Sequence, residues 1–270
     1  MPLFSAVAPL PVNRIKNRLF DPDARDYILR VEAADGERLE SQVRGAINAF
    51  VLGCKADGIW TSLVTSCIMA GARTVAGAIT PLVGNAPTNN NFVAGDYSRK
   101  LGLIGDDSTK YLNTGYNNND TTNFPQNDSH ISCYVTATQT DASGTLVGTT
   151  NSVGGQLSLH YNSTTNIICR NRASTTSLVS LAPIGFQGQS RNNSSNFFRR
   201  FTSTSGASDA TVTATSVAPV NLLLGVFAVG TGIQFSNARM SFYSIGKSLS
   251  IPNLDSRVTT LMNTLASVIV

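Results

Sequence analysis

The chain has 270 residues and a mass of 28.6 kDa, and 41% of its residues are apolar, enough to bury a full core in one or two domains. Only 13% are charged, and 20 basic against 16 acidic side chains give a net charge of +4. This balance excludes disorder driven by charge and is too mild to indicate nucleic acid as a partner. Polarity comes mainly from Asn, Ser, Thr and Gly, which is typical of an all-β protein of short strands and turns.

Charged residues are concentrated at the start of the chain, since residues 1–60 hold 16 of the 36 charged side chains and all three glutamates. We therefore expect a charged helical start and a separate β body. Residues 1–20 contain three prolines and no periodicity, which predicts an extended anchoring arm that orders on a partner; a disordered tail is the alternative.

A helical segment is predicted over residues 21–70. Asp21 followed by Pro22 is a good helix start, so we expect a helix over 22–34. Apolar residues at helical spacing predict a second helix over 37–55, and a third, short helix is predicted over 59–70.

Strand patterns dominate the next part, predicted as a β-sandwich over residues 71–250. Residues 131–140 alternate cleanly, and the wholly apolar run 222–229 predicts a central, buried strand. The other expected strands are 156–161, 166–170, 178–186, 196–202, 210–217 and 238–245. Short strands separated by turn residues favour a sandwich or barrel.

The last segment, residues 251–270, is predicted to be a helix. Its apolar residues are spaced 4, 3, 4 and 3 apart, at Leu254, Val258, Leu261, Leu265 and Val268. This is a seam of about two heptads. It fits docking onto the sandwich, or alternatively a short self-association helix.

Motifs for catalysis and cofactors are missing. Gly246-Lys247-Ser248 lacks the leading glycine of a phosphate-binding loop, and the four cysteines form no CxxC pair, so we expect buried free thiols, no metal and no cofactor. His130 and His160 are expected to be structural. The acids after residue 70 are all aspartates expected in loops or turns, so the paired carboxylates of a glycosidase are not predicted, and we expect no enzyme and no catalytic residue.

Basic residues outnumber acids after residue 130. This excess of basic residues would attract an anionic glycan, but it also fits solvated strand faces and contacts between protomers. The densest patch is Phe197-Phe198-Arg199-Arg200-Phe201, where alternation predicts Arg199 on one face with Phe197 and Phe201, and Arg200 on the other with Phe198.

Signals for export or membrane insertion are weak. Residues 1–10 lack a positive start, and no run approaches the roughly 18 apolar residues that span a bilayer. We expect a chain made in the cytoplasm without a signal peptide and without membrane insertion.

Two long stretches resemble a known family. Residues 49–116, which begin AFVLGCKADGIWTSLVTSCIMAG, and residues 235–270, which begin FSNARMSFYSIGKSLSIPNLDSR, resemble a module of virion proteins of tailed bacteriophages. In that family these segments open and close a concanavalin A-like (laminin-G-like) jelly-roll sandwich. The resemblance covers roughly residues 21–270 and implies a mainly β fold with helices before it and a helix closing it.

The resemblance also implies a function. It suggests a structural virion protein, a tail-fibre or surface subunit, working as a homo-oligomer, often a trimer, attached through residues 1–20 and located in the virion. The alternative is a module that binds a host surface glycan. The family carries no single activity, so the ligand-binding residues are unknown at this stage.

Overall fold

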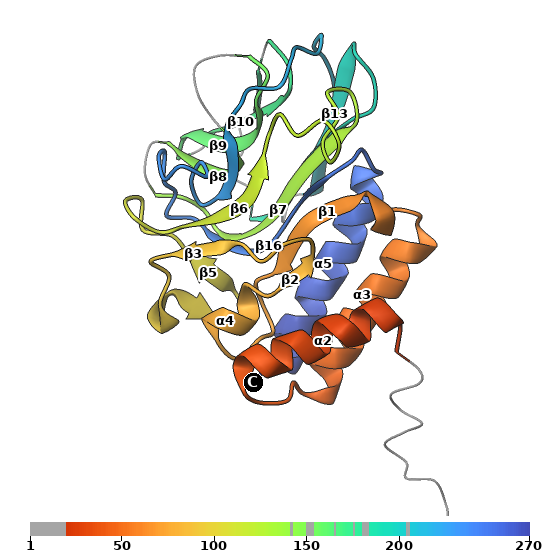
Figure 1. Cartoon of the computed structure of the whole chain (residues 1–270), viewed down its shortest axis with the longest axis vertical. Coiled ribbons are helices and arrows are strands. Elements are labelled where there is room, and N and C mark those ends of the chain that lie inside the picture. Colours follow the sequence, from red (N-terminus) through yellow and green to blue (C-terminus); the bar gives the residue numbers. More distant parts are fainter. Residues whose placement is uncertain are drawn as a thin grey trace, which may run out of the picture.

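The computed structural model describes residues 20–140, 143–149, 154–164, 166–174, 176–179, 184–203 and 206–270. These residues form two antiparallel sheets stacked into a β-sandwich, with helices on the outside of one sheet (Figure 1). The prediction of a β-sandwich that follows N-terminal helices and is closed by a C-terminal helix is confirmed. The predicted arm over residues 1–20 lies outside the described residues except for Phe20.

The larger sheet has nine strands in the described part of the chain. They are Leu63–Ile68 (β1), Pro81–Val83 (β2), Tyr97–Ser98 (β4), Gly102–Ile104 (β5), Ser129–Ala137 (β7), Gly185–Arg191 (β12), Asn196–Ser203 (β13), Gly206–Thr213 (β14) and Arg239–Gly246 (β16). Their order is β14-β13-β12-β7-β16-β1-β2, with β5 paired to β16 and β4 to β5.

The second sheet has seven described strands. They are Thr88–Asn90 (β3), Tyr111–Asn117 (β6), Gly144–Gly148 (β8), Leu157–Ser163 (β9), Asn166–Asn171 (β10), Ser177–Val179 (β11) and Leu223–Val226 (β15), in the order β11-β10-β9-β8-β15-β6-β3. Strand β15 lies between β8 and β6, and its Leu224 and Val226 are fully buried, so the buried inner strand is confirmed; it covers only Leu223–Val226 of the predicted 222–229, because the backbone leaves the extended conformation at Phe227, with φ 68°.

Two apolar cores stabilise the molecule. The first lies between the sheets and includes Val135, Leu159 and Phe201. The second lies between the outer face of the larger sheet, which contributes Phe186 and Phe242, and the helices. The result is three layers: helices, the nine-stranded sheet and the seven-stranded sheet.

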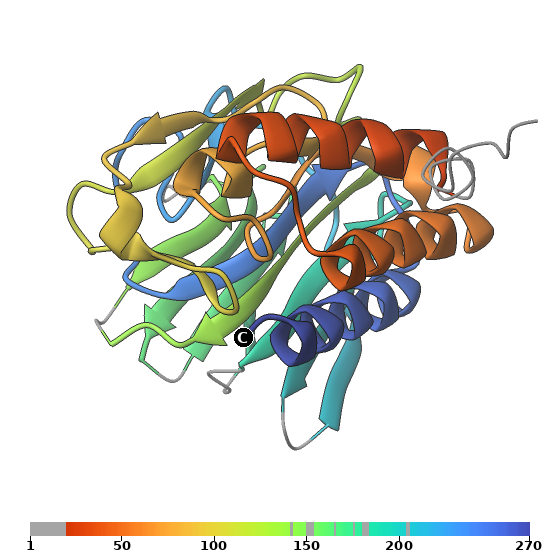
Figure 2. The same cartoon turned by 90° about the horizontal axis from the view of Figure 1, so that it is seen from below.

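The helical layer consists of Pro22–Asp35 (α2), Ser41–Ala56 (α3) and Ile251–Val268 (α5), which lie side by side in Figure 2. Short helices at Trp60–Ser62 (η1), Val75–Ala78 (α4) and Ala94–Asp96 (η2) complete the set. Asp21 caps α2 as predicted, since its side chain accepts from the Asp23 amide, and Gly36 ends the helix in the left-handed conformation at φ 68°.

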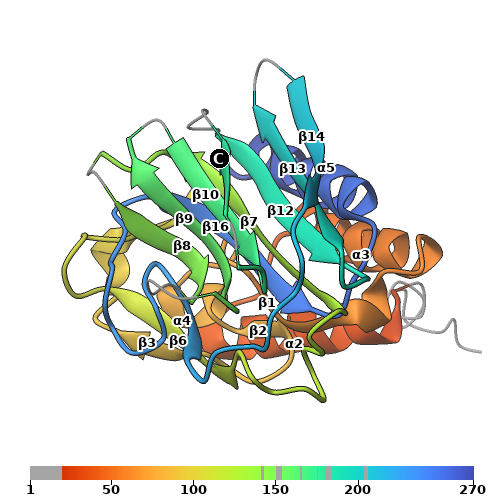
Figure 3. The ribbon, with the colours of Figure 1, turned by 90° about the horizontal axis from the view of Figure 1, so that it is seen from above.

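The heptad seam of helix α5 is buried inside the molecule. Leu254, Val258, Leu261 and Leu265 are buried, and the helix packs on α3, β12 and β13 (Figure 3). This confirms docking onto the sandwich as the use of the seam.

Two secondary-structure predictions were wrong. The helix expected over 59–70 is a short 3-10 turn followed by β1, which is buried on both faces: Cys67 points into the core between the sheets and Ile68 into the helical core. The strand expected over 178–186 covers parts of two strands, because β11 belongs to the smaller sheet and β12 to the larger.

The positions of two acids also differ from expectation. Asp209 lies in strand β14 and Asp255 in helix α5, not in loops. Among the described helices, none combines the length and apolar character needed to cross a bilayer.

Candidate functional site

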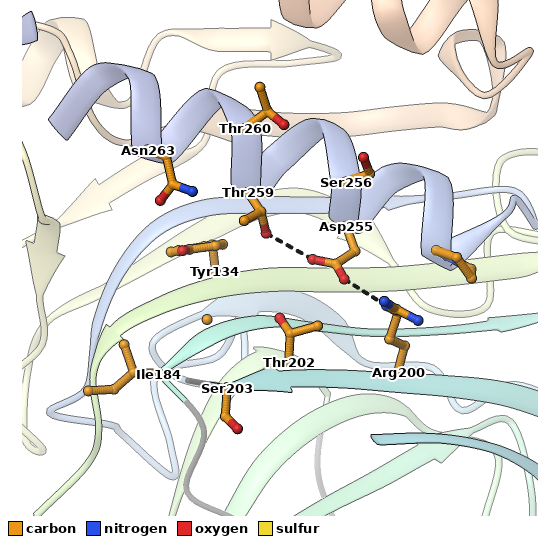
Figure 4. A pocket seen from close by; sticks show the side chains of 12 residues that line it. Tyr134, Ile184, Arg200, Thr202, Ser203, Asp255, Ser256, Thr259, Thr260 and Asn263 are labelled. Carbon is orange, nitrogen blue, oxygen red and sulfur yellow. Dashed lines mark hydrogen bonds and ion pairs between the residues drawn. The ribbon is translucent and has the colours of Figure 1, made fainter. Parts of the chain in front are cut away.

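A groove runs between helix α5 and the exposed end of strand β13, and it has a volume of about 550 Å³ (Figure 4). This size is in the range of small-molecule sites. Nine of the twelve lining residues bear hydroxyl, amide or charged groups, although apolar atoms contribute most of the surface that the lining exposes. The lining residues are Tyr134, Ile184, Gly185, Arg200, Thr202, Ser203, Pro252, Asp255, Ser256, Thr259, Thr260 and Asn263.

The sheet wall of the groove follows from the alternation of β13. Phe197 and Phe201 are buried between the sheets, and the Arg199 guanidinium carbon lies 5.7 Å from the centre of the Phe201 ring. Phe198 and Arg200 therefore point to the opposite, helical face, as predicted. This register places Arg200 and Thr202 in the groove.

The helix wall comes from the face of α5 that lies beside the buried seam. Asp255, Thr259 and Asn263 follow one another at the four-residue spacing that places side chains on one helix face. Ser256 and Thr260 widen this face. The side chains of Ser256, Thr260 and Asn263 are exposed and make no hydrogen bond within the described part of the chain, so they are available to a ligand.

An ion-pair cluster lies deep in the groove. Arg200 donates from Nε to Asp255 Oδ2 at 2.6 Å and from Nη1 to Asp209 Oδ2 at 2.7 Å, and Thr259 Oγ1 donates to Asp255 Oδ1 at 2.9 Å. Burial alone lowers the pKa of the Arg200 guanidinium, but the two carboxylates more than offset this and raise it above its ordinary value. The guanidinium is therefore held in its charged form between the two carboxylates.

Tyr134 provides an aromatic surface in the sheet wall. Its ring is partly buried against the helical core, and burial followed by the nearby charge of Asp255 raises the pKa of its phenol. Beside it, Gly185 has φ 134°, and a Cβ there would lie 2.7 Å from the Thr202 carbonyl oxygen. A glycine is therefore required at this point, which also leaves the groove open next to the ring.

No family model matches the sequence, and no curated protein matches it either. Similar solved structures include the binding domain of botulinum neurotoxin serotype D, at 15% identity and a TM-score of 0.43, over 77% of this chain and 52% of that one. Domain 4 of an extracellular arabinanase from Geobacillus stearothermophilus, in complex with arabinotriose, is similar at 9% identity and a TM-score of 0.37, over 65% and 82%. A Shewanella oneidensis protein of unknown function is similar at 13% identity and a TM-score of 0.33, over 61% and 75%.

This chain spans about half the length of the neurotoxin binding domains that it matches. At these levels of identity the likeness is one of fold alone.

The two histidines lie outside the groove. His130 is buried, with Nδ1 2.6 Å from the Lys247 carbonyl oxygen and Nε2 3.0 Å from Ser244 Oγ. The carbonyl can only accept, so Nδ1 carries the proton and Nε2 accepts from the serine. Burial lowers the pKa of His130 and of His160 to about 4. The two hydrogen bonds of His130 fit its expected structural role, and for His160 that role stays a prediction.

The cysteines are also structural. Cys54, Cys67, Cys133 and Cys169 are buried free thiols, as predicted. No group of three metal-ligating side chains occurs among the described residues.

A second hollow, at Trp60, is less suited to a ligand. It has a volume of about 450 Å³ and is lined by Asp23, Lys55, Gly58, Trp60 and Thr61. The Lys55 ammonium lies 5.7 Å from the centre of the indole ring and 2.6 Å from Asp23. The aromatic face is thus already covered by a cation of the chain itself.

From the sequence, Arg200 falls in the densest basic patch and Asp255 among the aspartates expected in loops or turns, and nothing brings the two together. A signal was present: α5 has a polar stripe at Asp255, Thr259 and Asn263 beside its heptad seam. Pairing that stripe with the outward face of β13 requires knowing that α5 docks there, which local patterns do not give.

Proposed function

We propose that this chain is a carbohydrate-binding protein that holds its ligand in the groove between α5 and β13 without cleaving it. The observation that supports this most is the lining itself. Six of its twelve residues bear hydroxyl groups, one of them on the aromatic ring of Tyr134, and three more supply an amide and an ion pair; the other three are Ile184, Gly185 and Pro252. A sugar presents the complementary set, since its hydroxyls donate and accept hydrogen bonds and its C–H face packs on aromatic rings.

The charges in the groove support binding over hydrolysis. A glycosidase acid needs a raised pKa, commonly with a second carboxylate across the bond to be cleaved. Here both nearby carboxylates, Asp209 and Asp255, are held by the same guanidinium of Arg200. Asp255, the carboxylate that lines the groove, accepts hydrogen bonds within the chain on both of its oxygens, from Arg200 and from Thr259, so neither oxygen is left without an internal partner.

The experiment is a binding screen of the whole chain against immobilised neutral and acidic polysaccharides, followed by titration with the best ligand. Asn263→Ala removes an exposed amide from the groove. Asn253→Ala is the matched control, because Asn253 is also exposed on α5 but does not line the groove. We expect Asn263→Ala to weaken binding roughly tenfold, as for a lost hydrogen bond, and Asn253→Ala to leave it unchanged.

Equal affinities of the two variants, or no binding to any polysaccharide, would contradict the proposal. Release of reducing ends from a bound polysaccharide would show that the chain is an enzyme instead.

The virion role is a separate proposal that rests on the sequence resemblance alone. A fibre or surface subunit, a trimeric state and attachment through residues 1–20 remain predictions. Glycan binding is compatible with each of them, because a subunit of a surface assembly can also bind a receptor.

A further inference from the structure

A further hollow, distinct from the one at Trp60 and smaller than the groove, lies next to the groove toward the start of α5. It has a volume of about 220 Å³ and is lined by Ser190, Asn192, Asn196 and Phe198 on the sheet side and by residues 249–252 on the helix side. Pro252 lines both hollows. The two hollows therefore meet at Pro252, and we refer to them together as the channel along α5.

On both walls of this channel, residue numbers increase from the small hollow to the large one. On β13, Phe198 lines the small hollow, while Arg200 and Thr202 line the large one. On α5, Ile251 lines the small hollow and Asn263 the far part of the large one. The helix wall from Ile251 to Asn263 is about 18 Å long at 1.5 Å per residue. The strand wall from Asn196 to Ser203 is about 23 Å long at 3.3 Å per residue.

This length exceeds that of a single sugar ring, and both ends carry exposed polar groups. Asn192 at the small hollow and Asn263 at the large one are exposed side chains that can contact a ligand at opposite ends. The exposed pyrrolidine ring of Pro252 lies at the junction of the two hollows.

The charge of the channel is unsuited to acidic sugars. Among its lining residues the charged ones are Arg200 and Asp255, and Asp209 of β14 binds the same guanidinium. One cation thus faces two carboxylates, and the cluster has a net charge of −1. A uronic or sialic acid placed here would meet repulsion without a free cation to offset it.

We propose that the channel binds an extended chain of neutral sugars, several rings long, lying along α5 and β13. This rests on the proposed carbohydrate function and gives it a ligand class: internal segments of a neutral polysaccharide, as opposed to single sugars, chain ends or acidic glycans.

The test is calorimetric titration of the whole chain with oligosaccharides of increasing length, from one to six rings, cut from the neutral polysaccharide that binds best. Wild type is expected to gain affinity with each added ring until the channel is full, and then to level off. Asn263→Ala should weaken binding at all lengths. Asn192→Ala should weaken only the longer ligands, by roughly tenfold.

A single sugar that binds as tightly as the longer ligands would overturn the extended-chain inference and leave the proposed function standing. An equal effect of Asn192→Ala at all lengths, or tighter binding of a uronic acid oligomer, would do the same. Failure of wild type to bind any sugar would overturn both.

Discussion

The Asp255 carboxylate on helix α5 lies 2.6 Å from Nε of Arg200 on strand β13, and this contact joins the C-terminal helix to the sheet across the floor of the groove. Asp255 is 5% exposed, so the pair is largely shielded from water. A second carboxylate, Asp209, binds the same guanidinium from the exposed edge strand β14. The three residues differ in burial, which allows their contributions to be separated.

Asp255→Ala is expected to lower the free energy of unfolding by about 2–3 kcal/mol, because it leaves a half-shielded guanidinium with one partner and the Thr259 hydroxyl without its acceptor. Asp209→Ala is the control and should cost less than about 1 kcal/mol, because Asp209 itself is exposed to solvent. Urea unfolding of both variants measures the difference. Equal losses would mean that the buried pair does not stabilise the docking of α5.

Arg172→Lys is expected to destabilise the chain strongly. Arg172 is fully buried and donates to the carbonyl oxygens of Asn118, Phe124 and Pro125 and to the Asn118 side chain. An ammonium keeps the charge but cannot reproduce the planar fork, so we expect a loss of roughly 3 kcal/mol. Arg25→Lys, on the exposed face of α2, should leave the melting temperature unchanged. A melting temperature of Arg172→Lys within a degree of wild type would contradict this role.

Stability should fall as the pH is lowered from 7 to 5. The pKa of buried His130 is about 4 in the fold, and His160 behaves in the same way, whereas an unfolded histidine titrates near 6.5. The unfolded chain therefore binds more protons between these values. The contribution of the two histidines to the free energy of unfolding is present in full above about pH 6.5 and is lost as the pH falls toward 4. At pH 5 the loss is about 2 kcal/mol per histidine.

His130→Gln isolates one of these contributions. The free energy of unfolding, measured in urea at pH 7 and at pH 5, should differ less between the two pH values in the variant than in wild type. The difference that remains in the variant is expected to come from His160. A difference of the same size in both proteins would exclude His130 as a source of the pH dependence.

The four cysteines are expected to be unreactive in the folded chain. All are buried, and burial raises the pKa of Cys54, Cys67 and Cys169 to about 12 and that of Cys133 further still. Reaction with a disulfide reagent should be negligible at pH 8 in buffer and should reach four thiols in denaturant. Rapid labelling of any thiol in the native state would show that its surroundings open.

Much of the fold could be predicted from local patterns. Helix α2 follows from Asp21 and Pro22, α5 from its seam, and the two faces of β13 from strict alternation. Strand β1 could not be predicted, because Leu63–Ile68 is buried on both faces and so lacks the alternation of a half-exposed strand, and its spacing also fits a helix. The break between β11 and β12 was missed because sheet membership is set by distant partners. The groove was missed for the same reason, since Arg200 and Asp255 are 55 positions apart.

The central claim is that the groove between α5 and β13 binds sugar, and the most direct test is a ¹H–¹⁵N NMR titration of the whole chain with a panel of neutral oligosaccharides. We predict that amide signals of residues 200–203 and 255–263 shift together and saturate. Absence of shifts with every sugar, or shifts gathered elsewhere, for example around Trp60, would contradict it.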